Sequence, residues 1–139
     1  MSTISISSTR PAVKYFLGFN VLVWLPYGLF CFITPGFLSE AAGVTAVTPT
    51  GSTELRAMYG GLQAGIGALC AAALVKPDLV RTALGTLSFL VVGLFSARLA
   101  GAFIDWGFSA YTGGAFAFEL ATLAIAISLL RAEPQPASL

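Results

Sequence analysis

Four long apolar stretches, each of helical length, dominate the pattern of hydrophobic and polar positions along the chain. They lack the period-two alternation of β-strands, and a run of about 20 apolar residues is long enough to cross a bilayer as a helix. The pattern therefore predicts four membrane-spanning helices, at residues 14–34, 54–75, 79–104 and 112–130.

The connections between these helices predict their arrangement. A long connection follows the first helix, and we expect residues 36–42 to form a short helix at the membrane interface. Thr53 is the expected N-cap of the second helix. With two short connections and one long one, the chain is predicted to be an all-α, up-down-up-down four-helix bundle within the membrane. The predicted divisions are a polar tail (1–12), the bundle (13–131) and a disordered tail (132–139).

Composition excludes several classes of function. The chain is 57% hydrophobic and 9% charged, whereas a soluble domain carries about 25% charged residues. A net charge of +1 with seven Lys and Arg residues excludes a basic nucleic-acid binder. The chain has no His, so no His-ligated metal or haem is expected, and we assign no metal ligands. Since no nucleophile lies beside a base, we lean against an enzyme and assign no catalytic residue.

Positive charge sets the predicted orientation. Five cations fall at one end of the predicted bundle, and the positive-inside rule places that end and both termini in the cytoplasm. The long connection and the turn between the last two helices then face outward. These cations are Arg10, Lys14, Lys76, Arg81 and Arg131.

Polar residues gather in the opposite, outer half. Counting a rise of roughly 1.5 Å per residue from Arg131 places Glu119 about 18 Å into the hydrocarbon. A charge there costs at least ~2.5 kcal/mol, so we expect Glu119 to be paired, with Arg98 the nearest cation. Two interpretations stay open: a structural ion pair that fixes helix register, or a pocket that holds a ligand head group. The predicted ligand-binding set is Arg98, Glu119, Tyr59, Gln63, Arg56 and Tyr27, while Glu54 and Asp105 are assigned structural or loop roles.

Helical periodicity divides the second helix into three faces. At roughly 100° per residue, Arg56, Tyr59 and Gln63 share one polar stripe, although Arg56 is also placed to snorkel to the interface. A neighbouring stripe of small residues allows close helix packing and comprises Ala57, Gly60, Gly61, Ala64, Ala68 and Ala71. The remaining face is predicted to contact lipid and comprises Leu55, Met58, Leu62, Ile66 and Leu69.

The segment Glu54-Leu-Arg-Ala-Met-Tyr-Gly-Gly resembles a signature of small bacterial four-helix membrane proteins catalogued as a domain of unknown function. In that group a Glu-x-Arg-x-x-Tyr-Gly-Gly segment opens the second helix, and the other matches here are Arg98, Asp105 and Glu119. Where the group has Asp-Gly, Trp106 separates Asp105 from Gly107. The layout is similar to that of DoxX-like proteins. The resemblance implies a multi-pass protein of the bacterial inner membrane, and the DoxX comparison suggests quinone or thiol-redox partners.

These observations support one function and leave two alternatives open. The first is binding of an amphipathic or lipid-like molecule, of the quinone or isoprenoid class, in an outer-side polar pocket. One alternative is a structural or accessory subunit of a larger membrane complex, for which a redox complex is one candidate. The other is a proton-coupled small-molecule carrier. The expected partners are membrane lipid, an amphipathic small molecule, and other membrane subunits or further copies of the chain. No cofactor is expected other than a bound quinone or lipid.

Overall fold

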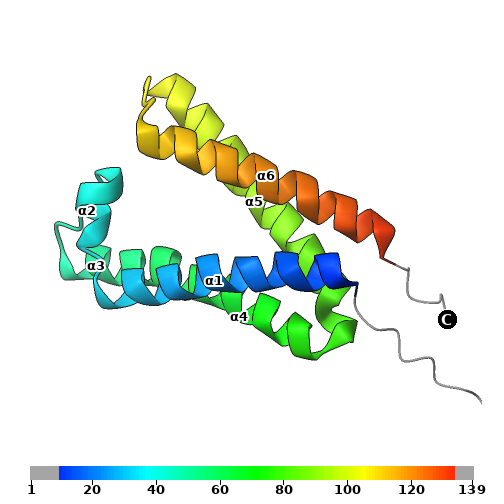
Figure 1. The fold of residues 1–139 in the computed structure, drawn as a ribbon. Coiled ribbons are helices and arrows are strands. Elements are labelled where there is room, and N and C mark those ends of the chain that lie inside the picture. The colour runs from blue at the N-terminus through cyan, green and yellow to red at the C-terminus, as the bar shows by residue number, and fades with distance from the viewer. Residues whose placement is uncertain (1–9, 134–139) are drawn as a thin grey trace, which may run out of the picture.

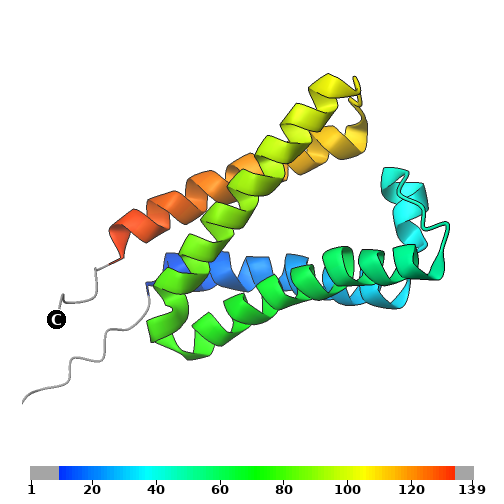
Figure 2. The ribbon, with the colours of Figure 1, turned by 180° about the vertical axis from the view of Figure 1, so that it is seen from behind.

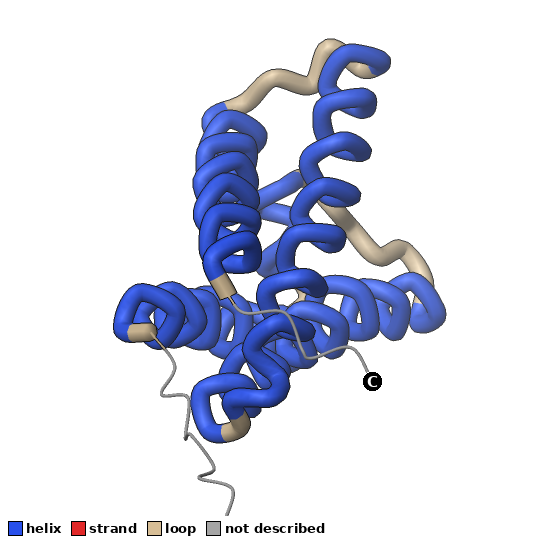
Figure 3. Tube along the Cα trace, turned by 90° about the vertical axis from the view of Figure 1, so that its right-hand side faces the viewer, coloured by secondary structure: helices blue, strands red, loops and turns tan. Residues whose placement is uncertain are grey.

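The computed structural model describes residues 10–133, and these residues form helices and connecting loops with no strand (Figure 3). The all-α fold class is therefore confirmed. The elements are α1 (Pro11–Ile33), α2 (Phe37–Ala42), α3 (Pro49–Leu55), a π-helical stretch η1 (Arg56–Gly61), α4 (Leu62–Val75), a 3₁₀ turn η2 (Pro77–Leu79), α5 (Val80–Ile104) and α6 (Ala110–Ala132).

Four helical segments are long and apolar enough to cross a membrane: 11–33, 49–75, 77–104 and 110–132. The short helix expected at 36–42 is present as α2. The predicted tails were too long, because α1 already begins at Pro11 and α6 ends only at Ala132. The outer parts of both tails, residues 1–9 and 134–139, lie outside the described residues.

Two helix starts differ from the prediction because of capping. The second span begins at Pro49, since the Thr48 hydroxyl accepts a hydrogen bond from the Gly51 N–H at 3.0 Å and proline is well suited to a first helical position. The expected cap at Thr53 was therefore wrong. In the same way, the Ser109 hydroxyl oxygen accepts a hydrogen bond from the Thr112 N–H at 3.2 Å, and α6 begins at Ala110.

The four spans form two hairpins, α1 with α3–η1–α4 and α5 with α6 (Figure 1). The hairpins meet at the end that carries Pro11, Val80 and Ala132, which we call the closed end, and diverge toward the other end, which we call the open end (Figure 2). The short helix α2 stands at the open end. The up-down-up-down chain path is as predicted, but the spans are splayed rather than parallel.

Small residues hold the first hairpin together. A Cβ built on Gly28 would lie 2.3 Å from the Ala64 nitrogen, and one on Gly60 would lie 2.8 Å from the Phe32 Cβ. Such distances leave no room for a side chain, so the two backbones approach closely there, as small residues allow in membrane helices. Gly60 and Ala64 thus confirm the predicted packing stripe at these positions.

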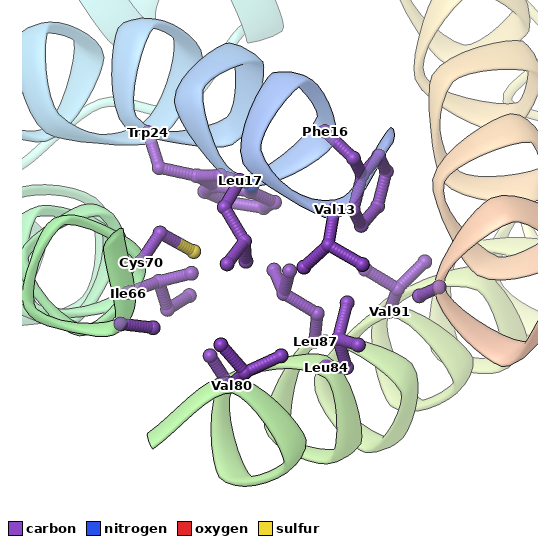
Figure 4. Close-up of a cluster of buried hydrophobic side chains, with 13 residues drawn as sticks. Val13, Phe16, Leu17, Trp24, Ile66, Cys70, Val80, Leu84, Leu87 and Val91 are labelled. Atoms are coloured by element: carbon purple, nitrogen blue, oxygen red, sulfur yellow. The ribbon is translucent and has the colours of Figure 1, made fainter. Parts of the chain in front are cut away.

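Aliphatic residues from all four spans fill the closed end (Figure 4). Val13 and Leu17 of α1, Leu84 of α5 and Ala126 of α6 have no exposed surface. Arg81 Nη1 donates to the carbonyl oxygens of Leu130 and Glu133 at 3.2 and 2.7 Å and so satisfies the C-terminal end of α6. The five cations predicted to share one end all lie near this end, at Arg10, Lys14, Lys76, Arg81 and Arg131.

Candidate ligand-binding site

A cavity of about 850 Å³ lies between the two hairpins. Its volume is within the usual range for small-molecule sites, roughly 300–1,000 Å³. Helices α1, α4, α5 and α6 and the stretch η1 all contribute, and Ala42 and Val44 contribute from the end of α2 and the loop after it. The wall is mainly aliphatic and aromatic, and its polar members are Tyr27, Tyr59, Gln63, Arg98, Tyr111, Thr112 and Glu119.

Arg98 and Glu119 form the charged part of the wall. Arg98 Nε and Nη2 each lie 3.0 Å from Glu119 Oε1. Glu119 is 3% exposed, and its second oxygen, Oε2, has no hydrogen-bond partner among the described residues. The predicted pairing is thus present. Since α5 and α6 belong to the same hairpin, the pair does not connect the two hairpins across the cavity.

Aromatic side chains of α1 and α6 are in contact beside the cavity. The Phe118 ring lies 5.8 Å from the ring of Trp24 and 6.4 Å from that of Phe19. The side chains of Tyr27 and Tyr111 interact between the same two helices. These contacts tie α1 to α6 where the hairpins diverge.

The opposite side, between α4 and α5, is open. Met58 and Leu62 line the cavity and are 55% and 47% exposed, and Phe89 lines it from α5 and is 85% exposed. The exposure of Met58 and Leu62 agrees with the predicted lipid-facing surface, although both residues also border the cavity because the hairpins diverge. The prediction was wrong for Ile66, which is buried.

The π-helical stretch explains why one predicted ligand residue lies elsewhere. It spans Arg56–Gly61, within the segment singled out in the sequence, and its turn is wider than that of an α-helix. A constant α-helical step had placed Arg56 on the stripe of Tyr59 and Gln63. In the structure Tyr59 and Gln63 line the cavity and Arg56 does not.

Arg56 caps the first helix instead. Its Nη1 donates to the carbonyl oxygens of Phe32 and Ile33, and its guanidinium lies 5.8 Å from the Phe32 ring centre. Unpaired carbonyls at a helix C-terminus attract a cation. Arg56 is thus a structural residue, and Tyr27, Tyr59, Gln63, Arg98 and Glu119 are the predicted ligand residues that one cavity brings together.

The two residues assigned structural roles lie outside this cavity. Glu54 is exposed in α3, and it is helical, as in the predicted helix from residue 54. Asp105 follows the last residue of α5 and lines a smaller hollow of about 210 Å³ together with Arg98 and Thr112. Arg98 therefore borders both cavities.

The wall residues that sequence reasoning did not assign to the site include Trp24, Tyr111, Thr112 and Phe118. The ring centre of Tyr111 lies 6.0 Å from the Arg98 guanidinium carbon. The sequence did contain a signal for this face of α6. The wall residues of α6 recur at helical spacing, at Thr112, Ala115, Phe118 and Glu119.

Four helices long enough to span a membrane, arranged as two hairpins around a cavity with a buried ion pair, define a small multi-pass membrane protein. Residues 12–130 match DUF4345, a domain of unknown function, and the chain belongs to this family. No curated protein and no solved structure matches the chain. The resemblance to a domain of unknown function is thus confirmed, while the link to DoxX-like proteins stays a prediction.

Proposed function

We propose that the protein binds an amphipathic, lipid-like small molecule of the quinone or isoprenoid class in the cavity between its hairpins. The head group lies at Arg98 and Glu119, and the apolar tail extends toward the opening between α4 and α5. The observation that carries this proposal is Glu119 itself. It is a carboxylate almost fully buried in the wall of a large cavity, with one oxygen bonded to Arg98 and the other without a partner.

The shape of the wall supports a ligand that arrives from the bilayer. Met58, Leu62 and Phe89 are apolar and exposed at the open side, so an apolar tail meets no polar barrier there. By the positive-inside rule, the cation-rich closed end is cytoplasmic. The cavity then opens in the outer half of the bacterial inner membrane, with both chain termini in the cytoplasm.

A proton-coupled carrier is the second candidate. The observation in its favour is that Arg98 borders both the large cavity and the small hollow beside Asp105. Intramembrane carboxylates are typical of proton routes. Such a carrier would give uptake into proteoliposomes that follows an imposed pH gradient, whereas a binding protein would not.

Native mass spectrometry of the protein released from its own membranes tests the proposal. The key variant is Gly93→Phe, because Gly93 lines the cavity and a Cβ built there meets no atom within 4 Å. The Cβ of a phenylalanine therefore meets no obstruction there, and we expect its ring to fill space that the ligand needs. Gly85→Phe is the matched control, on the same helix, equally unobstructed and outside the cavity.

We expect a bound small molecule on the wild-type protein and on Gly85→Phe, and its loss from Gly93→Phe. A bound molecule that all three proteins retain would contradict the assigned cavity. Bound protein chains in place of a small molecule would support an accessory subunit instead.

A further inference from the structure

The charges in the cavity wall cancel. Of the residues from 10 to 133 that line the large cavity, Arg98 and Glu119 are the only Lys, Arg, Asp or Glu residues, and they are paired at 3.0 Å. A head group with its own net charge, such as a phosphate, would enter a largely apolar site where no opposite charge is left over. Burial of such a charge is costly, so the wall favours a neutral head group.

The unpartnered oxygen of Glu119 adds a second requirement. An ionised carboxylate only accepts hydrogen bonds, and a buried acceptor without a donor is destabilising. The hydrogen bond from Arg98 Nε and the ion-pair contact of its Nη2 are both made to Oε1, and Oε2 receives no hydrogen bond from the described residues. A ligand group that donates to Oε2 would remove this cost, whereas a group that can only accept would not.

We infer that the head group bound in this cavity is neutral and donates a hydrogen bond to Glu119, as the hydroxyl of an isoprenoid alcohol or of a quinol does. The inference rests on the proposed function and narrows its ligand class. A hydroxyl also accepts, so the same oxygen can receive a bond from an N–H of Arg98, which carries five N–H donors, or from a tyrosine hydroxyl of the wall.

Three probes with one tail and different heads test the inference. They are farnesol, which donates; farnesyl methyl ether, which is neutral and cannot donate; and farnesyl phosphate, which is anionic. Each is used in tritiated form with the full-length protein in nanodiscs, and saturable binding is measured by scintillation proximity. We expect farnesol to bind most tightly, with the ether and the phosphate each weaker by about tenfold or more.

Each alternative result overturns a defined step. Equal binding of the ether would remove the role of the donor, and equal or tighter binding of the phosphate would contradict the charge argument. Absence of saturable binding for all three probes would instead count against the proposed function in the isoprenoid class, and would remove the inference with it.

Glu119→Gln sharpens the test, because it keeps the side-chain shape and leaves Arg98 without its counter-charge. We expect the preference to shift toward farnesyl phosphate by about tenfold or more relative to farnesol. Glu54→Gln makes the same chemical change at an exposed position at the open end and should leave the order unchanged. An unchanged order in a folded Glu119→Gln protein would overturn the inference, and the wild-type comparison decides it if that variant does not fold.

Discussion

The two ends of this molecule use the same four spans in opposite ways. At the closed end, Leu17, Leu84 and Ala126 pack with no exposed surface, and Arg81 caps the end of α6. At the open end the hairpins diverge around a cavity of about 850 Å³, and an arginine pairs with a carboxylate in its wall.

The difference separates residues that hold the helices together from residues that serve the cavity. Small and aliphatic side chains bring the backbones together, as at Gly28 and Leu84. The pair of Arg98 with Glu119 joins α5 to α6, and those helices already belong to one hairpin. Its place in the cavity wall and the unpartnered oxygen of Glu119 are the features on which the proposed ligand role rests.

The largest predicted effect on stability is at the open end. Arg98→Ala leaves Glu119 buried without a counter-charge, and breaking a buried pair in this way costs about 3–5 kcal/mol of unfolding free energy. Unfolding followed by circular dichroism in detergent measures this loss. Arg56→Ala is the control, since it removes an arginine that caps a helix, which is worth about 1 kcal/mol. Equal losses in the two variants would contradict the distinction between them.

A matched pair of leucines compares the two ends directly. Leu84→Ala removes a fully buried side chain at the closed end, and we expect a loss of about 2–5 kcal/mol from the resulting void. Leu62→Ala makes the same change in the cavity wall, where the side chain is 47% exposed, and should cost less than half as much. Thermal unfolding of both variants checks this order, and a larger loss at Leu62 would mean that the open end is packed like the closed one.

A pair of glycines on α1 gives the smallest expected effect. Gly28→Ala forces a Cβ to within 2.3 Å of the Ala64 nitrogen, and overpacking of this kind costs about 1–3 kcal/mol. Gly18→Ala places a Cβ where no atom lies within 4 Å, so it should be neutral or slightly stabilising because alanine favours helix. The same thermal measurement applies, and a Gly28→Ala protein as stable as Gly18→Ala would show that α1 and α4 are not held by close backbone contact.

Much of the fold was predictable because it depends on local chemistry and on hydropathy. Four apolar stretches gave four long helices, and the pairing of Arg98 with Glu119 followed from the cost of a lone buried charge. Capping shifted the boundaries: Thr48 and Ser109 begin helices a few residues before the apolar pattern does.

The site was only partly predictable because it depends on non-local geometry. The π-helical stretch at Arg56–Gly61 removes Arg56 from the stripe of Tyr59, and no periodicity analysis at a constant step reveals such a change. The divergence of the hairpins likewise depends on packing at the closed end. Because of this divergence, Met58 and Leu62 line the cavity while they also remain exposed on the predicted lipid-facing side.

The central claim is that Arg98 and Glu119 serve a ligand rather than hold the helices together. The most direct test replaces both, as Arg98→Leu with Glu119→Leu, because apolar substitution of a whole buried pair is often neutral for stability. The protein is released from its own membranes and examined by native mass spectrometry, with thermal unfolding measured in parallel. The account predicts a double variant with an unfolding temperature close to that of the wild type and without the wild type's bound small molecule. A double variant that unfolds, or one that retains the same bound mass, would contradict it.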